Sequence, residues 1–80
     1  MIKATAIKVH FNDEPHLLFK LEEDGELLLQ TEVTKNMAAF VVSRAHGDSF
    51  EDPLLQMLDE FIQCEAIDEY DQLIGQEWVD

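Results

Sequence analysis

The stretch SFEDPLLQMLDEFIQC, from Ser49 to Cys64, predicts an amphipathic helix against which the rest of the chain can pack. On a period of about 3.6 residues, one face carries apolar side chains and the opposite face carries acids and amides. The apolar face comprises Leu54, Leu55, Met57, Leu58, Phe61 and Ile62, and the polar face comprises Asp52, Gln56, Asp59 and Gln63. Asp52 is a favourable N-cap, and Pro53 suits the first helical position because the N–H that it lacks has no partner there. Glu65 would fall in the middle of the apolar face, so we expect the helix to span residues 52–64.

The first third of the chain alternates between apolar and polar residues, which predicts β-strands. Ala4 to Phe11 is the first predicted strand, and His16 to Glu22 is the second. Residues 12–15 form a turn between them, in which Pro15 should stop the pairing. In the first strand, Ile7, Val9 and Phe11 are expected on one face and Ala6, Lys8 and His10 on the other.

Glu23-Asp24-Gly25 closes a second predicted hairpin. A two-residue loop would set apolar residues opposite polar ones, so we expect a three-residue loop with Gly25 in the left-handed conformation. The expected pairs are Leu21–Leu27, Phe19–Leu29 and Leu17–Thr31.

The segment from Thr34 to Arg44 is compatible with a helix capped by Thr34 and stopped at Gly47, or with a strand over residues 39–43; a helix is preferred. A short third helix is expected where Ile67, Tyr70, Leu73 and Ile74 recur at helical spacing, and Trp78 is expected to dock on the domain. The predicted fold is a single α+β domain over residues 1–80. It is a three-stranded antiparallel β-meander packed against the helix at about 52–64, with one or two short helices.

Charge is distributed unevenly along the chain. Five basic residues face eighteen acidic ones, for a net charge of −13. All five basic residues and seven acidic ones lie in residues 1–44, whereas residues 45–80 hold eleven acidic residues and no Lys or Arg. This pattern disfavours direct nucleic-acid binding, which draws on Lys and Arg, and it favours a basic protein partner. Mutual repulsion among these carboxylates should raise their pKa values.

The sequence contains no recognisable catalytic or metal-binding motif, so we expect neither an enzyme nor a cofactor. His10, His16 and His46 lack the spacing of a metal site, although His10 and His16 could be neighbours at the hairpin ends. Cys64 lies among carboxylates that would raise its thiol pKa. A lone cysteine and the lack of a signal-peptide pattern favour the cytoplasm (the host cytoplasm if phage-encoded), and no apolar run is long enough to span a membrane.

Two functional hypotheses follow. In the first, the chain inhibits a nucleic-acid-handling protein by presenting carboxylates as a nucleic-acid mimic. The residues expected to bind that partner are Glu51, Asp52, Asp59, Glu60, Glu65, Asp68, Glu69 and Asp71. In size and charge the chain is similar to phage-encoded anti-CRISPR and anti-restriction proteins and to immunity proteins that block nuclease toxins.

In the second hypothesis, the chain is a structural or adaptor module that can form a homodimer, and its acidic surface serves only solubility. Its contacts would involve Leu18 and Leu28 on the sheet, or Tyr70 and Trp78 near the C-terminus.

Overall fold

The structure, a computed structural model, describes residues 1–45 and 52–80 and confirms the α+β class. Four strands form one antiparallel sheet in the order β3-β2-β1-β4. They are β1 (Ile2–Asn12), β2 (Glu14–Glu23), β3 (Glu26–Thr34) and β4 (Glu77–Val79). The predicted β-meander corresponds to β1, β2 and β3, whereas β4 is a fourth strand that we did not predict. The expected stop at Gly47 and the candidate residue Glu51 lie outside the described residues.

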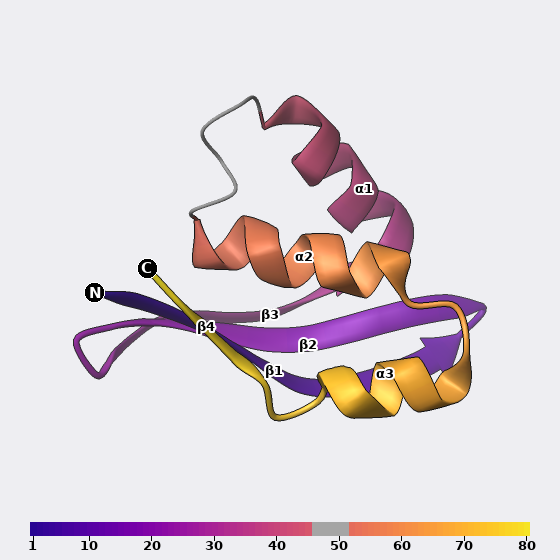
Figure 1. Cartoon of the computed structure of the whole chain (residues 1–80), viewed down its shortest axis with the longest axis horizontal. Coiled ribbons are helices and arrows are strands. Elements are labelled where there is room, and N and C mark those ends of the chain that lie inside the picture. The colour runs from indigo at the N-terminus through magenta and orange to yellow at the C-terminus, as the bar shows by residue number, and fades with distance from the viewer. Residues whose placement is uncertain (46–51) are drawn as a thin grey trace.

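β4 brings the C-terminus beside the N-terminus at the β1 edge of the sheet (Figure 1). Trp78 pairs with Ala4, and its side chain is only 8% exposed. The N–H of Asp80 donates to the carbonyl of Ile2 at 3.2 Å, and the N–H of Ile2 donates to the Asp80 carboxylate at 3.0 Å. Trp78 is therefore docked, as predicted.

A β-bulge in β1 decides which of its side chains face the core. The pairing with β2 shifts between Ala6 and Lys8, so Ile7 is the additional residue. Because a bulge changes the side-chain parity, Ala4 and Ala6 lie on the core face before it and Val9 after it. The expected grouping is therefore wrong for Ala6, which shares the core face with Val9, and Phe11 is 54% exposed.

The turn between β1 and β2 is tighter than predicted. Only Asp13 separates the paired residues Asn12 and Glu14, and its φ is 68°. Pro15 pairs with Phe11, so it does not end the first hairpin. The pairing of β2 with β3 begins at His16, and Pro15 therefore needs no hydrogen bond on that side.

The hairpin of β2 and β3 has a shorter turn and a different register from those that we predicted. Asp24 and Gly25 form a two-residue turn in which both φ angles are positive, 52° and 88°, as a type I′ turn requires. A bulge then absorbs Leu28. The observed pairs are Leu21–Leu29, Phe19–Thr31 and Leu17–Val33, so the predicted register is wrong by two residues although Leu17, Phe19 and Leu21 do face the core. Leu27 is 55% exposed.

Two helices lie on the core side of the sheet and pack against each other (Figure 1). α1 (Lys35–Arg44) packs against β2 and β3, and α2 (Pro53–Gln63) packs against β1 and β4. The hydroxyl of Thr34 accepts from the N–H of Met37 at 3.1 Å, which confirms that this segment is a helix. The Asp52 carboxylate caps α2, and the apolar face of α2 fills the centre of the core, where Met57 and Phe61 are fully buried.

α3 (Ile67–Leu73) is the predicted short third helix and lies beside β1 and the end of α2. Tyr70 and Leu73 are buried, but Ile67 is 69% exposed and does not join the core. Gly75 follows with a φ of 88°, and its N–H donates to the carbonyl of Ala6 at 2.8 Å, which directs the chain into β4. Within residues 1–45 and 52–80, no helix has the length and apolar character needed to cross a bilayer.

Candidate functional site

Six of the predicted partner-binding residues lie on the last turns of α2, on the segment after it and on α3, and two of them, Glu60 and Glu69, meet at one pocket. We call this group the acidic corner. It consists of Asp59, Glu60, Glu65, Asp68, Glu69 and Asp71. Asp52 does not belong to it. Its carboxylate accepts from the N–H of Leu54 at 2.9 Å at the start of α2, about 12 Å along the helix axis from Glu60.

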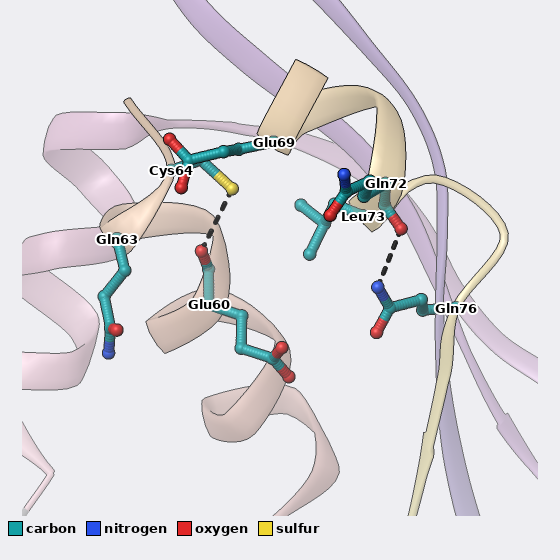
Figure 2. Close-up of a pocket in the computed structure, with 7 residues that line it drawn as sticks. All are labelled: Glu60, Gln63, Cys64, Glu69, Gln72, Leu73 and Gln76. Carbon is teal, nitrogen blue, oxygen red and sulfur yellow. Dashed lines mark hydrogen bonds between the residues drawn. The ribbon is translucent and has the colours of Figure 1, made fainter. Parts of the chain in front are cut away.

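A pocket of about 250 Å³ opens within the acidic corner (Figure 2). Its walls come from the end of α2, from α3 and from the segment before β4. The lining residues are Glu60, Gln63, Cys64, Glu69, Gln72, Leu73 and Gln76. The lining combines two carboxylates with three side-chain amides and contains no cationic group. The pocket is large enough for the end of one long side chain, and its oxygen atoms suit a guanidinium or ammonium group.

Glu60 is held in place by the docked C-terminal strand. Its carboxylate accepts a hydrogen bond from the indole N–H of Trp78. Its backbone carbonyl accepts from the thiol of Cys64 at 3.2 Å, as drawn in Figure 2. A carboxylate has about four acceptor sites, so Glu60 can still bind a cation while it retains the indole.

Glu69 is fixed by the first turn of its own helix. Its carboxylate accepts from the backbone N–H groups of Ala66 at 2.8 Å and Glu65 at 3.0 Å. These two bonds hold the pKa of Glu69 below its ordinary value. For this residue the expectation that the pKa is raised is wrong, because the hydrogen bonds to the charged form, together with the charge of Lys35, outweigh the effect of desolvation.

The remaining residues of the corner are open to solvent or half-buried. Asp59 accepts from the side-chain amide of Gln63 at 2.8 Å. Glu65, Asp68 and Asp71 are exposed. Across the described part of the chain, the ion pairs involve Asp24, Glu22, Glu32 and Glu77, and none reaches the acidic corner. Within the described residues, Lys35 acts on Glu69 from a distance, and the negative charge of the corner is otherwise unpaired.

Cys64 lines the pocket but is poorly suited to nucleophilic chemistry. Burial, together with the nearby charges of Glu69 and Glu60, raises the pKa of the thiol, and Lys35 offsets this only in part. Lys35 uses its ammonium group structurally, since it donates to the carbonyl of Cys64 and, at 2.8 Å, to the hydroxyl of Tyr70. This arrangement supports binding through carboxylates and offers no activated nucleophile.

The sequence did not indicate the side-chain amides of the pocket. Gln63, Gln72 and Gln76 are ordinary surface residues in the sequence, and only the crossing of α2 and α3 places them around one opening. Only the contact between Gln72 and Gln76 is local in sequence. The side-chain amide of Gln76 donates to the backbone carbonyl of Gln72, four residues earlier, at 2.7 Å.

The residues expected to bind a partner under the second hypothesis differ in how far they are exposed. Tyr70 and Trp78 are buried and are not exposed anchors, whereas Leu28 is 53% exposed on the edge strand β3.

No family model, no curated protein and no solved structure matches this chain.

Proposed function

We propose that this protein binds a partner with a Lys/Arg-rich surface through its acidic corner, and that it thereby blocks the nucleic-acid-binding site of that partner. The observation that carries the proposal is the set of six carboxylates around the α2–α3 junction, where Lys35 is the cation that lies near and none of the ion pairs within the described residues engages them. Residues 52–80 contribute nine acidic residues and no Lys or Arg, and they occupy the β1 and β4 side of the sheet. A basic surface would find unneutralised negative charge there.

The spacing of the carboxylates supports a mimic of phosphates only at this corner. Asp52 and Asp59 are about 10 Å apart along α2, whereas successive phosphates of one DNA strand are about 3.4 Å apart along the axis. Asp68 and Asp71, by contrast, are separated by about 4.5 Å along α3. The pocket between Glu60 and Glu69 adds a place where one Arg side chain of the partner can insert and make charge-assisted hydrogen bonds.

The test begins with a corner variant, in which Glu65→Gln, Asp68→Asn and Asp71→Asn remove three exposed charges. A matched control variant carries Asp13→Asn, Glu23→Gln and Glu26→Gln, which remove the same charge from exposed residues of the β-meander. The immobilised chain is used to capture its partner from a lysate of the source cells at low salt, and the partner is then purified. We expect the corner variant to bind at least about tenfold more weakly, and the control variant to bind within about threefold of the natural chain.

Salt dependence gives a second readout of the same proposal. The affinity of the natural chain should fall steeply between 50 and 300 mM salt, over which the Debye length shortens from about 14 to about 6 Å, because the interaction relies on exposed charges. Equal affinity of the natural chain and the corner variant, or an affinity that does not change with salt, contradicts the proposal.

A second candidate function is association of two copies through β3. β3 is an edge strand, so the backbone groups on one side of it have no partner strand in the sheet. Leu27, Leu28 and Leu29 are 55%, 53% and 44% exposed along it, and Met37 and Phe40 of α1, the helix that follows β3, are 57% and 58% exposed. β3 and β4 are opposite edges of the sheet, so two copies that pair through β3 would keep their acidic corners apart.

Leu28→Glu tests the second candidate, and Ile67→Glu is its control because Ile67 is an exposed apolar residue of α3. Sedimentation velocity should show a dimer for the natural chain and for Ile67→Glu, and a monomer for Leu28→Glu. A monomer for the natural chain at concentrations of about 100 μM rejects this candidate.

A further inference from the structure

The strand register places two histidines and a glutamate together on the outer face of the sheet. His10 of β1 is directly opposite His16 of β2. Glu32 of β3 is opposite Leu18, in the next row of the outer face. The bulge at Ile7 is what turns His10 outward, because Val9 faces the core after it. Three neighbouring strands thus contribute one metal-binding side chain each.

These three side chains already contact one another. The rings of His10 and His16 stack with centroids 4.8 Å apart and an angle of 6° between their planes. Nε2 of His10 is hydrogen-bonded to a carboxylate oxygen of Glu32. One ligand atom from each residue can be chosen so that all three lie within 4.8 Å of one another.

The hydrogen bonds leave nitrogen lone pairs available. Nε2 of His16 lies 3.1 Å from the carbonyl oxygen of Asn12, which can only accept, so this nitrogen carries the proton and Nδ1 keeps its lone pair. The bond between His10 and Glu32 holds a proton between a nitrogen and a carboxylate. A metal ion can replace that proton, because metal ligands bind in their deprotonated forms.

We propose that His10, His16 and Glu32 form a binding site for a divalent transition-metal ion, with zinc as the test ion. Ligand atoms around tetrahedral zinc are about 3.4 Å apart, given metal–ligand bonds of about 2.0–2.1 Å. Atoms as much as 4.8 Å apart therefore have to approach by up to about 1.4 Å, whereas the hydrogen-bonded atoms of His10 and Glu32 have to move apart to admit the ion. The sheet fixes the three backbones, so rotation of the side chains brings this about, and one imidazole must leave the parallel stack so that both lone pairs point to the same centre.

The ligand set determines the class of ion. Two imidazoles and one carboxylate suit zinc, cobalt, nickel and copper, whereas calcium and magnesium prefer oxygen ligands alone. The side chains of His10 and Glu32 are 38% and 48% exposed, so a fourth position is open to water. The net charge of −13 attracts a dication, and Lys8, on the same outer face of β1, opposes it.

Calorimetric titration of the untagged protein with zinc chloride tests the site. We expect one zinc ion per chain with a micromolar dissociation constant, and affinity at least about tenfold weaker in each of His10→Gln, His16→Gln and Glu32→Gln. Glu26→Gln, a glutamate of the same strand, and Cys64→Ser are matched controls that should bind zinc like the natural chain. Far-ultraviolet circular dichroism of each metal-free variant verifies that it folds.

Two further measurements test the zinc site in the natural chain, without any substitution. In proton NMR spectra, zinc should shift the ring resonances of His10 and His16 but leave those of His46 in place. Excess zinc should raise the melting temperature by about 5 °C or more, and excess calcium should not. The proposal is overturned if zinc does not saturate the natural chain below about 1 mM, if the three ligand variants bind as well as the natural chain, or if Cys64→Ser removes the binding.

Discussion

The ammonium group of Lys35 joins the start of α1 to the end of α2, and we predict that Lys35→Met lowers the free energy of unfolding by about 2 kcal/mol. The group donates to the carbonyl of Cys64, which follows the last residue of α2, and to the hydroxyl of Tyr70 at 2.8 Å. It also lies 5.3 Å from the centre of the Tyr70 ring.

The magnitude follows from these contacts and from what the variant retains. A hydrogen bond with a charged donor contributes about 1.5–3 kcal/mol, and a cation at a helix C-terminus adds about 0.3–1 kcal/mol. Two features reduce the loss. Methionine keeps the apolar stem of Lys35, and the hydroxyl of Tyr70 still donates to the carbonyl of Cys64 at 2.9 Å. These partial losses do not add fully, so about 2 kcal/mol is the expected cost.

Urea unfolding monitored by circular dichroism measures this change, and Lys8→Met is the control. Lys8 is exposed and has no hydrogen bond or ion pair within the described residues, so its replacement removes the same charge at a cost below about 0.5 kcal/mol. The melting temperature of Lys35→Met should fall by about 10 °C. If the two variants are equally stable, the contacts of Lys35 do not stabilise the junction of the two helices.

Three other changes test the structure. Phe61→Ala, in a fully buried position, should lower the free energy of unfolding by about 3–5 kcal/mol in urea titrations, and a loss below about 1 kcal/mol would place Phe61 outside the core. Gly25→Ala should lower the free energy of unfolding by about 1 kcal/mol, because alanine is strained at the φ of 88° that Gly25 adopts. The new methyl group adds no clash, since nothing lies within 4 Å of it. An unchanged urea midpoint would exclude the type I′ turn. Glu69 has a lowered pKa, so its contribution to stability should be present above its ordinary pKa of 4.5 and be lost as the pH falls through its folded value. Unfolding curves of the natural chain and Glu69→Gln should therefore converge in acid, and a constant difference between pH 7 and pH 3 would argue against this role.

Local signals predicted the helices, although over residues 34–44 they also left a strand open. Asp52 and Pro53 specify the start of α2, and the apolar period specifies the face that it buries. Thr34 likewise caps α1 through its hydroxyl. In each case the residues that decide the element lie within one or two helical turns of one another.

The details of the sheet depended on information that the local pattern does not contain. The bulges at Ile7 and Leu28 each add one unpaired residue to a strand, and neither position carries a glycine or proline that would indicate a bulge in the sequence. In a regular pairing a two-residue turn opposes apolar and polar residues, but the bulge at Leu28 returns the apolar residues of β2 and β3 to the same face of the sheet. β4 has three residues, too few for an alternating pattern, and is held by its pairing with β1.

The charge of the candidate site could be read from the sequence, but its geometry could not. The meeting of Glu60 and Glu69 at one pocket depends on how α2 and α3 cross, and the approach of Glu32 to His10 depends on the register of three strands. The role of Glu69 in capping its own helix has a local signal, since it lies three residues after Ala66. That signal was missed because alanine is a poor N-cap.

A competition titration tests the proposed function most directly. A fluorescently labelled nucleic acid is bound to the purified partner, and the acidic chain is added while fluorescence anisotropy is followed. If the acidic corner occupies the nucleic-acid site, the natural chain and the control variant should release the labelled strand with one-to-one stoichiometry, and the corner variant should fail to do so at the same concentration. A ternary complex of partner, nucleic acid and chain, or equal release by the corner variant, would contradict it.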